Sequence, residues 1–66
     1  MKVLITGGSG LVGSGLTKLL TNTGYEVVWL SRSAGIKNGI TCYKWDYKSD
    51  FIDTKAFEGV TYIVHL

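Results

Sequence analysis

The chain reads TGGSGLVG from Thr6 to Gly13, and this stretch decides the fold because it joins an apolar strand to an amphipathic helix. The strand is expected at Val3–Ile5, where every residue is apolar, as in a parallel strand that is covered on both faces. The glycines then end the strand, and the spacing from Gly8 to Gly13 satisfies G-x-G-x-x-G. The rest of the expected fold follows from this strand–turn–helix unit.

The helix is expected from about Leu11 to Asn22. Gly24 lies where a left-handed residue commonly ends a helix. Apolar residues recur at positions i, i+4, i+7 and i+8, which places them on one helix face, whereas Thr17 falls mainly elsewhere. The expected apolar face consists of Val12, Leu16, Leu19 and Leu20.

Three further strands are expected, at Val27–Leu30, Ile40–Trp45 and Val60–Leu66. Ser31–Gly35 is expected to be a loop, and Thr54–Phe57 has the length of one helical turn. Consecutive parallel strands joined by right-handed crossovers take the order 3-2-1-4, numbered along the chain. The expected fold class is therefore α/β, with a Rossmann-type doubly wound parallel sheet.

The spacing of the glycines gives the turn a chemical use. Gly7 or Gly8 lets the backbone turn sharply out of the strand, and Gly10 lacks the Cβ that would keep a pyrophosphate away from the main chain. Gly13 lets the helix pack closely on the first strand, and the free amides at the helix start then point at the phosphates. The alternative is a glycine-rich turn without a ligand, which the entropy that glycines lose on folding disfavours.

The end of the second strand bears on the choice of cofactor. Sites that prefer NAD usually carry Asp or Glu there, whereas this chain has Ser31 followed by Arg32. A guanidinium can hold the 2′-phosphate of NADP with two hydrogen bonds, and Ser33 can add a hydroxyl. We therefore expect NADP rather than NAD, the alternative being that Arg32 is a solvated surface residue.

Composition restricts the function classes. The 66 residues make at most one small domain, and a net charge of +2 gives no support for binding to nucleic acid or a membrane. The single cysteine, Cys42, excludes a disulfide framework and a cysteine-based zinc site, so no metal is expected. The N-terminal apolar run is too short for a signal peptide, and a cytoplasmic location is expected.

The chain stops at Leu66 within an apolar strand, so residues 1–66 are expected to be the N-terminal portion of a longer domain. One full helix cannot cover both faces of a parallel sheet. If these residues were instead a complete protein, we would expect it to be unstable or to associate.

With Thr6–Gly13, Ser31–Arg32, Trp45–Asp46 and Ile63–Leu66 in view, the chain resembles the NAD-dependent epimerase/dehydratase group of the short-chain dehydrogenase/reductase superfamily. It looks most like the atypical "epimerase family proteins", which are described as NADP-dependent sugar-nucleotide epimerases. The resemblance covers nearly all of the chain. It implies an oxidoreductase or isomerase that passes hydride to and from the nicotinamide, with a small-molecule substrate such as a nucleotide sugar.

The resemblance also implies individual site residues. Asp46 matches an acidic residue near the adenine amino group, with Tyr47 beside it, and Leu66 matches the start of a stretch that passes the adenosine ribose. Asp46 can instead cap the segment after the third strand, and Leu66 can instead be sheet core. The implied cofactor-binding set is Gly7, Ser9, Gly10, Leu11, Val12, Gly13, Ser31, Arg32, Asp46, Tyr47 and Leu66.

The chain departs from the family in one respect. Reductases and epimerases of the superfamily typically use a Tyr-x-x-x-Lys pair, and none of the four tyrosines here has a lysine four residues later. No catalytic residue is therefore assigned, and a non-catalytic NADP(H)-binding sensor on the same fold is the alternative function. His65 is expected to be a core or supporting residue, Trp29 and Trp45 packing residues, and Cys42 a buried small hydrophobe.

Overall fold

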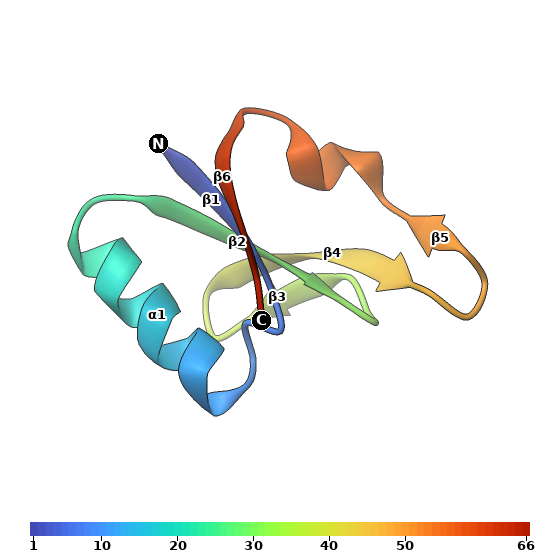
Figure 1. Ribbon diagram of the computed structural model, residues 1–66, viewed down its shortest axis with the longest axis horizontal. Coiled ribbons are helices and arrows are strands. Elements are labelled where there is room, and N and C mark those ends of the chain that lie inside the picture. Colours follow the sequence, from blue (N-terminus) through green and yellow to red (C-terminus); the bar gives the residue numbers. More distant parts are fainter.

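The computed structural model describes residues 1–66 as one twisted sheet with a helix on one side, as Figure 1 shows. The central strand is β1, which pairs in parallel with β2 on one side and with β6 on the other. The elements in chain order are β1 (Lys2–Thr6), α1 (Leu11–Asn22), β2 (Glu26–Ser31), β3 (Gly35–Lys37), β4 (Ile40–Asp46), β5 (Phe51–Ile52), the 3₁₀ helix η1 (Thr54–Phe57) and β6 (Val60–His65).

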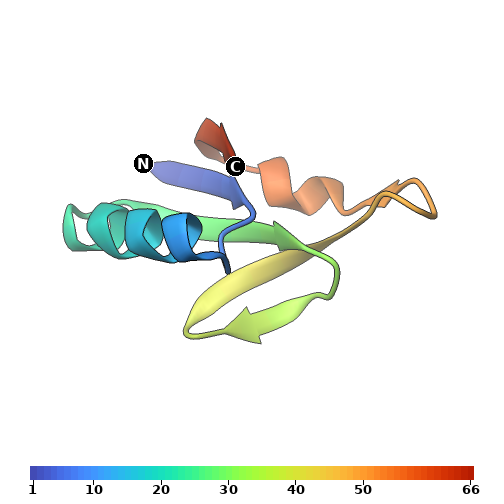
Figure 2. The same ribbon diagram turned by 60° about the horizontal axis from the view of Figure 1, so that its bottom comes forward.

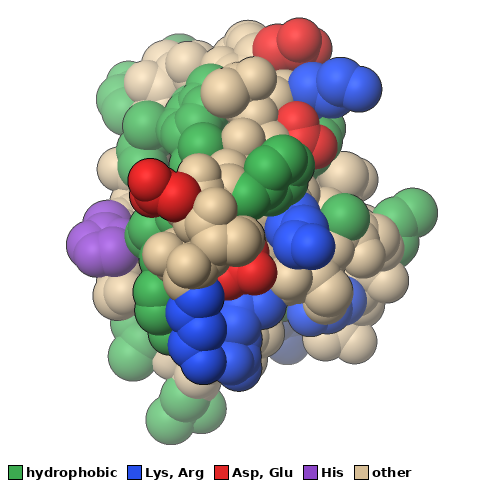
Figure 3. All heavy atoms as spheres, turned by 90° about the vertical axis from the view of Figure 1, so that its right-hand side faces the viewer, with side chains coloured by type: hydrophobic (Ala, Val, Ile, Leu, Met, Phe, Trp, Pro, Cys, Tyr) green, Lys and Arg blue, Asp and Glu red, His purple; other side chains and the backbone are tan.

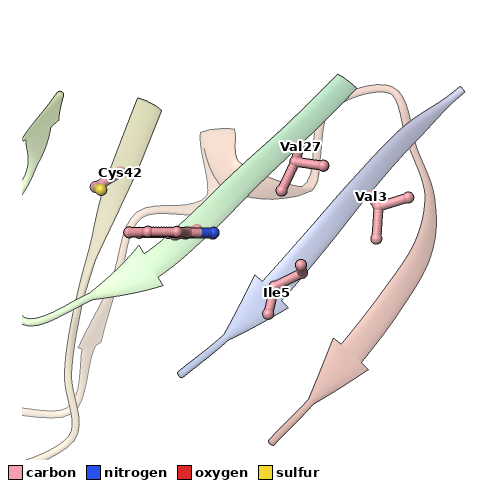
Figure 4. Close-up of a cluster of buried hydrophobic side chains, with 5 residues drawn as sticks. Val3, Ile5, Val27 and Cys42 are labelled. Carbon is pink, nitrogen blue, oxygen red and sulfur yellow. The ribbon is translucent and has the colours of Figure 1, made fainter. Parts of the chain in front are cut away.

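The core forms on both faces of β1, because successive side chains of a strand point to opposite faces. Val3 and Ile5 join a cluster on the face that α1 covers, and this cluster is drawn in Figure 4. Leu4 belongs to a second cluster, which includes Ala56 of η1. Figure 2 shows α1 and η1 on opposite sides of the sheet. The expected β1, buried on both faces, is confirmed, since Leu4 and Ile5 are fully buried.

The strand order differs from the expected 3-2-1-4. The sheet runs β3-β4-β2-β1-β6, with β5 paired to β4 outside this path. The parallel strands β4, β2, β1 and β6 are neighbours in that sequence, but β3 adds an antiparallel edge strand where only a loop was expected. The cause is the dipeptide Asn38–Gly39, whose residues have φ values of 53° and 79°. Positive φ at both central residues is what a two-residue hairpin turn requires, so the chain folds back into β3–β4.

Helix α1 has the expected bounds, and Gly24 follows it with φ at 99°. The expected apolar face is wrong in part, because Val12 and Leu19 are 70% and 63% exposed while Thr17 is 6% exposed. The Thr17 hydroxyl accepts a hydrogen bond from Trp29 Nε1 at 3.0 Å and donates one to the Gly13 carbonyl at 2.7 Å. A hydroxyl that forms hydrogen bonds can be buried at little cost in free energy, so Thr17 can face the sheet. The buried or half-buried positions are Gly13, Leu16, Thr17 and Leu20.

Strand β6 is less buried than its apolar sequence suggests. It is an edge strand that pairs with β1 alone, and Tyr62 and Ile63 are 53% and 58% exposed. The expectation that His65 lies in a buried strand is therefore wrong, since its side chain is exposed. Cys42 is buried and unpaired, as expected. No helix of the structure has the length and hydropathy needed to cross a bilayer.

Candidate functional site

The glycine turn leaves the sheet at the C-terminal end of β1. Gly7 has φ at 76°, a left-handed conformation that side chains other than glycine rarely adopt. The carbonyl of Gly7 accepts a hydrogen bond from the amide of Gly10 at 3.2 Å, which closes the turn. The Ser14 amide then donates to the Gly10 carbonyl at 2.8 Å, which begins the hydrogen bonding of α1. This geometry is the sharp turn that the glycines predicted.

Two glycines of the turn are required by the packing of the protein itself. A Cβ on Gly13 would overlap the carbonyl oxygen of Gly7 and lie 2.6 Å from the Cα of Gly8. A Cβ on Gly8 would overlap the indole ring of Trp29. Both positions are buried. The close packing expected of Gly13 is therefore confirmed, and Gly8 has the additional task of making room for Trp29.

Gly10 differs from these two, because nothing in the fold demands a glycine there. Its φ and ψ are −73° and 175°, which any residue can adopt. A Cβ at this position would meet only the Gly7 carbonyl oxygen, at an ordinary contact distance of 3.5 Å. The space beside Gly10, at the start of α1, is therefore open.

The N-terminus of α1 is free of competing groups. No side chain caps it, and its first turn contains no acidic residue. The amides of Leu11 and Val12 precede the first helical hydrogen bond, and both side chains are exposed. Unpaired amides and the positive end of the helix dipole favour an anion at this point. A diphosphate fits this arrangement.

A pocket of about 430 Å³ connects the glycine turn with the end of β2. Of the expected site residues, Gly7, Ser9 and Arg32 line it together with Ser31 and Tyr47. Gly10, Leu11, Val12, Gly13, Asp46 and Leu66 are not among the lining residues. Ser33, which was expected to add a hydroxyl, also lines the pocket, and the structure adds three lining residues that were not assigned to the site from the sequence, namely Leu30, Lys37 and Trp45.

The pocket is basic where it meets the end of β2. Arg32 and Lys37 both line it, and no acidic side chain does. The Ser31 hydroxyl donates to the Ser33 carbonyl, which fixes the bend of the chain between the two serines. Figure 3 views the molecule from the side to which β2 and β4 run, and Lys and Arg side chains gather low on this face. The pocket therefore offers cations to an anionic ligand and nothing that would repel it.

Residues 3–66 match the family model described as the NAD dependent epimerase/dehydratase family. This chain belongs to the NAD-dependent epimerase/dehydratase family. The match covers nearly every residue and implies the Rossmann arrangement of strands, with residues 3–66 as a nucleotide-binding portion. The family uses NAD or NADP. Comparisons with curated proteins and with solved structures gave no significant match.

Two aromatic residues of this family member form one wall of the pocket. The rings of Trp45 and Tyr47 meet edge to face, with centroids 6.3 Å apart and planes at 70°. Trp45 is half-buried, so it packs against the second core cluster while also lining the pocket. The expectation that Trp45 only packs is therefore incomplete. Lining of this kind offers a flat surface to a planar ring of a nucleotide.

Asp46 has a local structural task in this chain. Its Oδ1 accepts a hydrogen bond from the amide of Lys48 at 3.0 Å, which builds the turn between β4 and β5. This bond, with a further one from Ser49, lowers the pKa of the Asp46 carboxyl below its usual value of 3.8. Asp46 Oδ1 therefore caps the segment after β4, as the alternative interpretation expected. A contact of Asp46 with adenine stays a prediction.

Leu66 lies beside the glycine turn, and its expected contact with the ribose stays a prediction. Its amide donates to the Thr6 hydroxyl at 3.3 Å, and a Cβ on Gly7 would be 3.4 Å from the Leu66 Cβ. The Thr6 hydroxyl also forms a 2.6 Å hydrogen bond with Nδ1 of His65. The end of β6 is thereby tied to the end of β1. No group of three or more potential metal ligands occurs in the structure.

Proposed function

We propose that this chain is the NADP(H)-binding part of an oxidoreductase of the epimerase/dehydratase type that acts on a nucleotide sugar. The family supports a nucleotide cofactor, and the observation that carries the proposal is Gly10. The space at its side-chain position is open, so the fold itself would tolerate a larger residue there. A glycine that the protein does not need for its own packing is explained by a pyrophosphate that approaches the main chain.

The proposed binding groups lie partly in the pocket and partly beside it, at the start of α1 and at the ends of β4 and β6. The amides near Leu11 and Val12 receive the pyrophosphate, with Ser9, Gly7 and Gly13 shaping the turn around it. Tyr47 and Asp46 lie toward the adenine, and Leu66 passes the ribose. When bound, NADP would supply a nicotinamide ring for hydride transfer to and from the substrate, and the protein would fix the orientation of the two.

The preference for NADP over NAD rests on the end of β2. Arg32 lines the pocket, and no carboxylate is present there to accept hydrogen bonds from a ribose or to repel a phosphate. Guanidinium and phosphate form paired, charge-assisted hydrogen bonds, so an added 2′-phosphate strengthens binding.

The test is a fluorescence titration of the protein with NADPH and with NADH, repeated for Arg32→Ala. We expect wild type to bind NADPH more tightly than NADH, and we expect the substitution to weaken NADPH binding by about tenfold, the scale of one charge-assisted contact. NADH binding should be nearly unchanged. An unaltered preference in Arg32→Ala would show that this residue does not select the cofactor.

The reaction type has a separate test. The protein with bound NADP is incubated with nucleoside-diphosphate sugars, and the products are analysed for epimerised or oxidised sugars. Conversion of a nucleotide sugar supports the proposed class of reaction, whereas intact cofactor binding without conversion across the panel would point to the sensor function.

A further inference from the structure

Lys37 is a basic residue of the pocket that the proposed cofactor contacts leave unused. It lies on β3, the short antiparallel strand between β2 and β4 in the chain. Its backbone is paired with Ile40, next to the Asn38–Gly39 turn. Although Lys37 is exposed, its side chain lines the same pocket as Ser9 and Arg32.

The register of the sheet places Lys37 on the same sheet face as Ser31 of the pocket. Strand neighbours in register share a sheet face, so Lys37 lies on the face of Ile40 and Cys42. Cys42 is paired with Trp29 of β2, and Ser31, two residues after Trp29, lies on this face as well. Lys37 and Ser31 are therefore on one side of the sheet, Lys37 beside Ile40 at the start of β4 and Ser31 beside Lys44 near its end, and residues 32–34 join their strands.

We infer that Lys37 is a second cation for the 2′-phosphate of NADP and that it determines cofactor preference together with Arg32. This inference rests on the proposed NADP binding. A phosphate monoester carries close to two negative charges at neutral pH, so one guanidinium leaves part of the charge uncompensated. The β3–β4 hairpin would supply the second charge, because Lys37 lines the same pocket as Arg32. The two basic residues together would balance the charge of one phosphate.

The experiment compares the dissociation constants of NADPH and NADH for wild type, Lys37→Gln and Lys37→Arg. Lys55→Gln is the matched control. Lys55 lies on η1 and does not line the pocket, so this substitution removes the same charge at a distance from it. We expect Lys37→Gln to weaken NADPH binding by about tenfold, Lys37→Arg to restore most of it, and NADH binding to stay constant in all variants. Constant NADH affinity also shows that the variants are folded.

The outcomes separate the two levels of the proposal. If wild type prefers NADPH and Lys37→Gln behaves like Lys55→Gln, the role of Lys37 is refuted while the proposed function stands. If wild type binds neither dinucleotide, or prefers NADH, the proposed function fails and this inference fails with it. A salt titration gives a second measure, because loss of a phosphate contact makes the NADPH dissociation constant less dependent on ionic strength.

Discussion

The two connections that lead into and out of β2 are built in opposite ways. The first runs from β1 through the glycine turn and the twelve-residue α1. In this turn Gly8 packs against Trp29, and Gly13 packs against the Gly7 carbonyl. The second runs from β2 to β4 through an exposed loop and the three-residue β3. The first therefore offers main-chain amides next to buried contacts, and the second offers exposed cationic side chains. The main-chain amides suit a diphosphate. The cationic side chains suit discrimination between two cofactors that share this diphosphate.

The glycines of the first connection fall into two groups, those that the packing of the protein requires and one that it does not. Gly8 and Gly13 are fixed by contacts inside the protein, whereas Gly10 borders open space. Substitutions at these positions should therefore separate stability from cofactor binding.

Gly13→Ala should cause the largest loss of stability. The new Cβ meets backbone atoms of Gly7 and Gly8, which cannot rotate away as a side chain would. We expect the free energy of unfolding to fall by about 3 kcal/mol, the upper range for overpacking, as measured by urea denaturation. Gly15→Ala is the control, because nothing lies within 4 Å of its Cβ and alanine favours the helix interior. Equal stability of Gly13→Ala and wild type would refute the packing argument.

Trp29→Phe should have the next largest effect. The substitution removes the indole N–H that donates to Thr17 and leaves space next to Gly8. We expect a loss of about 1–2 kcal/mol in the free energy of unfolding, the usual range for one buried hydrogen bond with a small cavity. Trp45→Phe is the matched control, since Trp45 is only half-buried and should lose less. Both losses are measured in the same urea series. A loss for Trp29→Phe no larger than that for Trp45→Phe would contradict the prediction.

Gly39→Ala tests the second connection. Its φ of 79° strains any residue with a Cβ, while the space around it is empty, so the effect comes from the backbone alone. We expect a cost of about 1 kcal/mol in the free energy of unfolding, with a reduced ratio of NADPH to NADH affinity if the hairpin holds Lys37 in place. Gly24→Ala offers a comparison at a similar φ of 99° outside the hairpin, and it should leave that ratio unchanged.

Asp46→Asn should have the smallest effect, and the effect should depend on pH. Because the folded-state pKa of Asp46 is lowered by the Lys48 amide, its carboxylate stabilises the fold above about pH 4 and loses this contribution as the pH falls through the lowered value. Asparagine keeps an acceptor but removes the charge. The variant should thus be slightly less stable than wild type at neutral pH, with the gap closing in acid. Thermal unfolding followed at several pH values measures it, and a gap that widens in acid would contradict the assignment.

Local patterns in the sequence predicted the glycine turn and the bounds of α1, because glycine spacing and helical periodicity depend on neighbouring residues. The burial of Thr17 was not predictable in this way, since its hydroxyl is satisfied by Trp29, which is twelve residues away in the chain. The hairpin was signalled by Asn38–Gly39, but β3 is too short to show a strand pattern. That Lys37 lines the pocket depends on the tertiary arrangement of the β3–β4 hairpin and the β2 end, which no local pattern contains.

The main-chain cradle at the start of α1 is tested most directly by Gly10→Ser, for which NADPH affinity and the free energy of unfolding are measured on the same preparation. Serine is a favoured residue at the N-cap, and the backbone there already has extended angles, so unfolding should stay within about 1 kcal/mol of wild type. The new side chain occupies the space of the diphosphate, and we expect NADPH affinity to fall by about a hundredfold or more. A folded Gly10→Ser protein that binds NADPH as tightly as wild type would contradict the account.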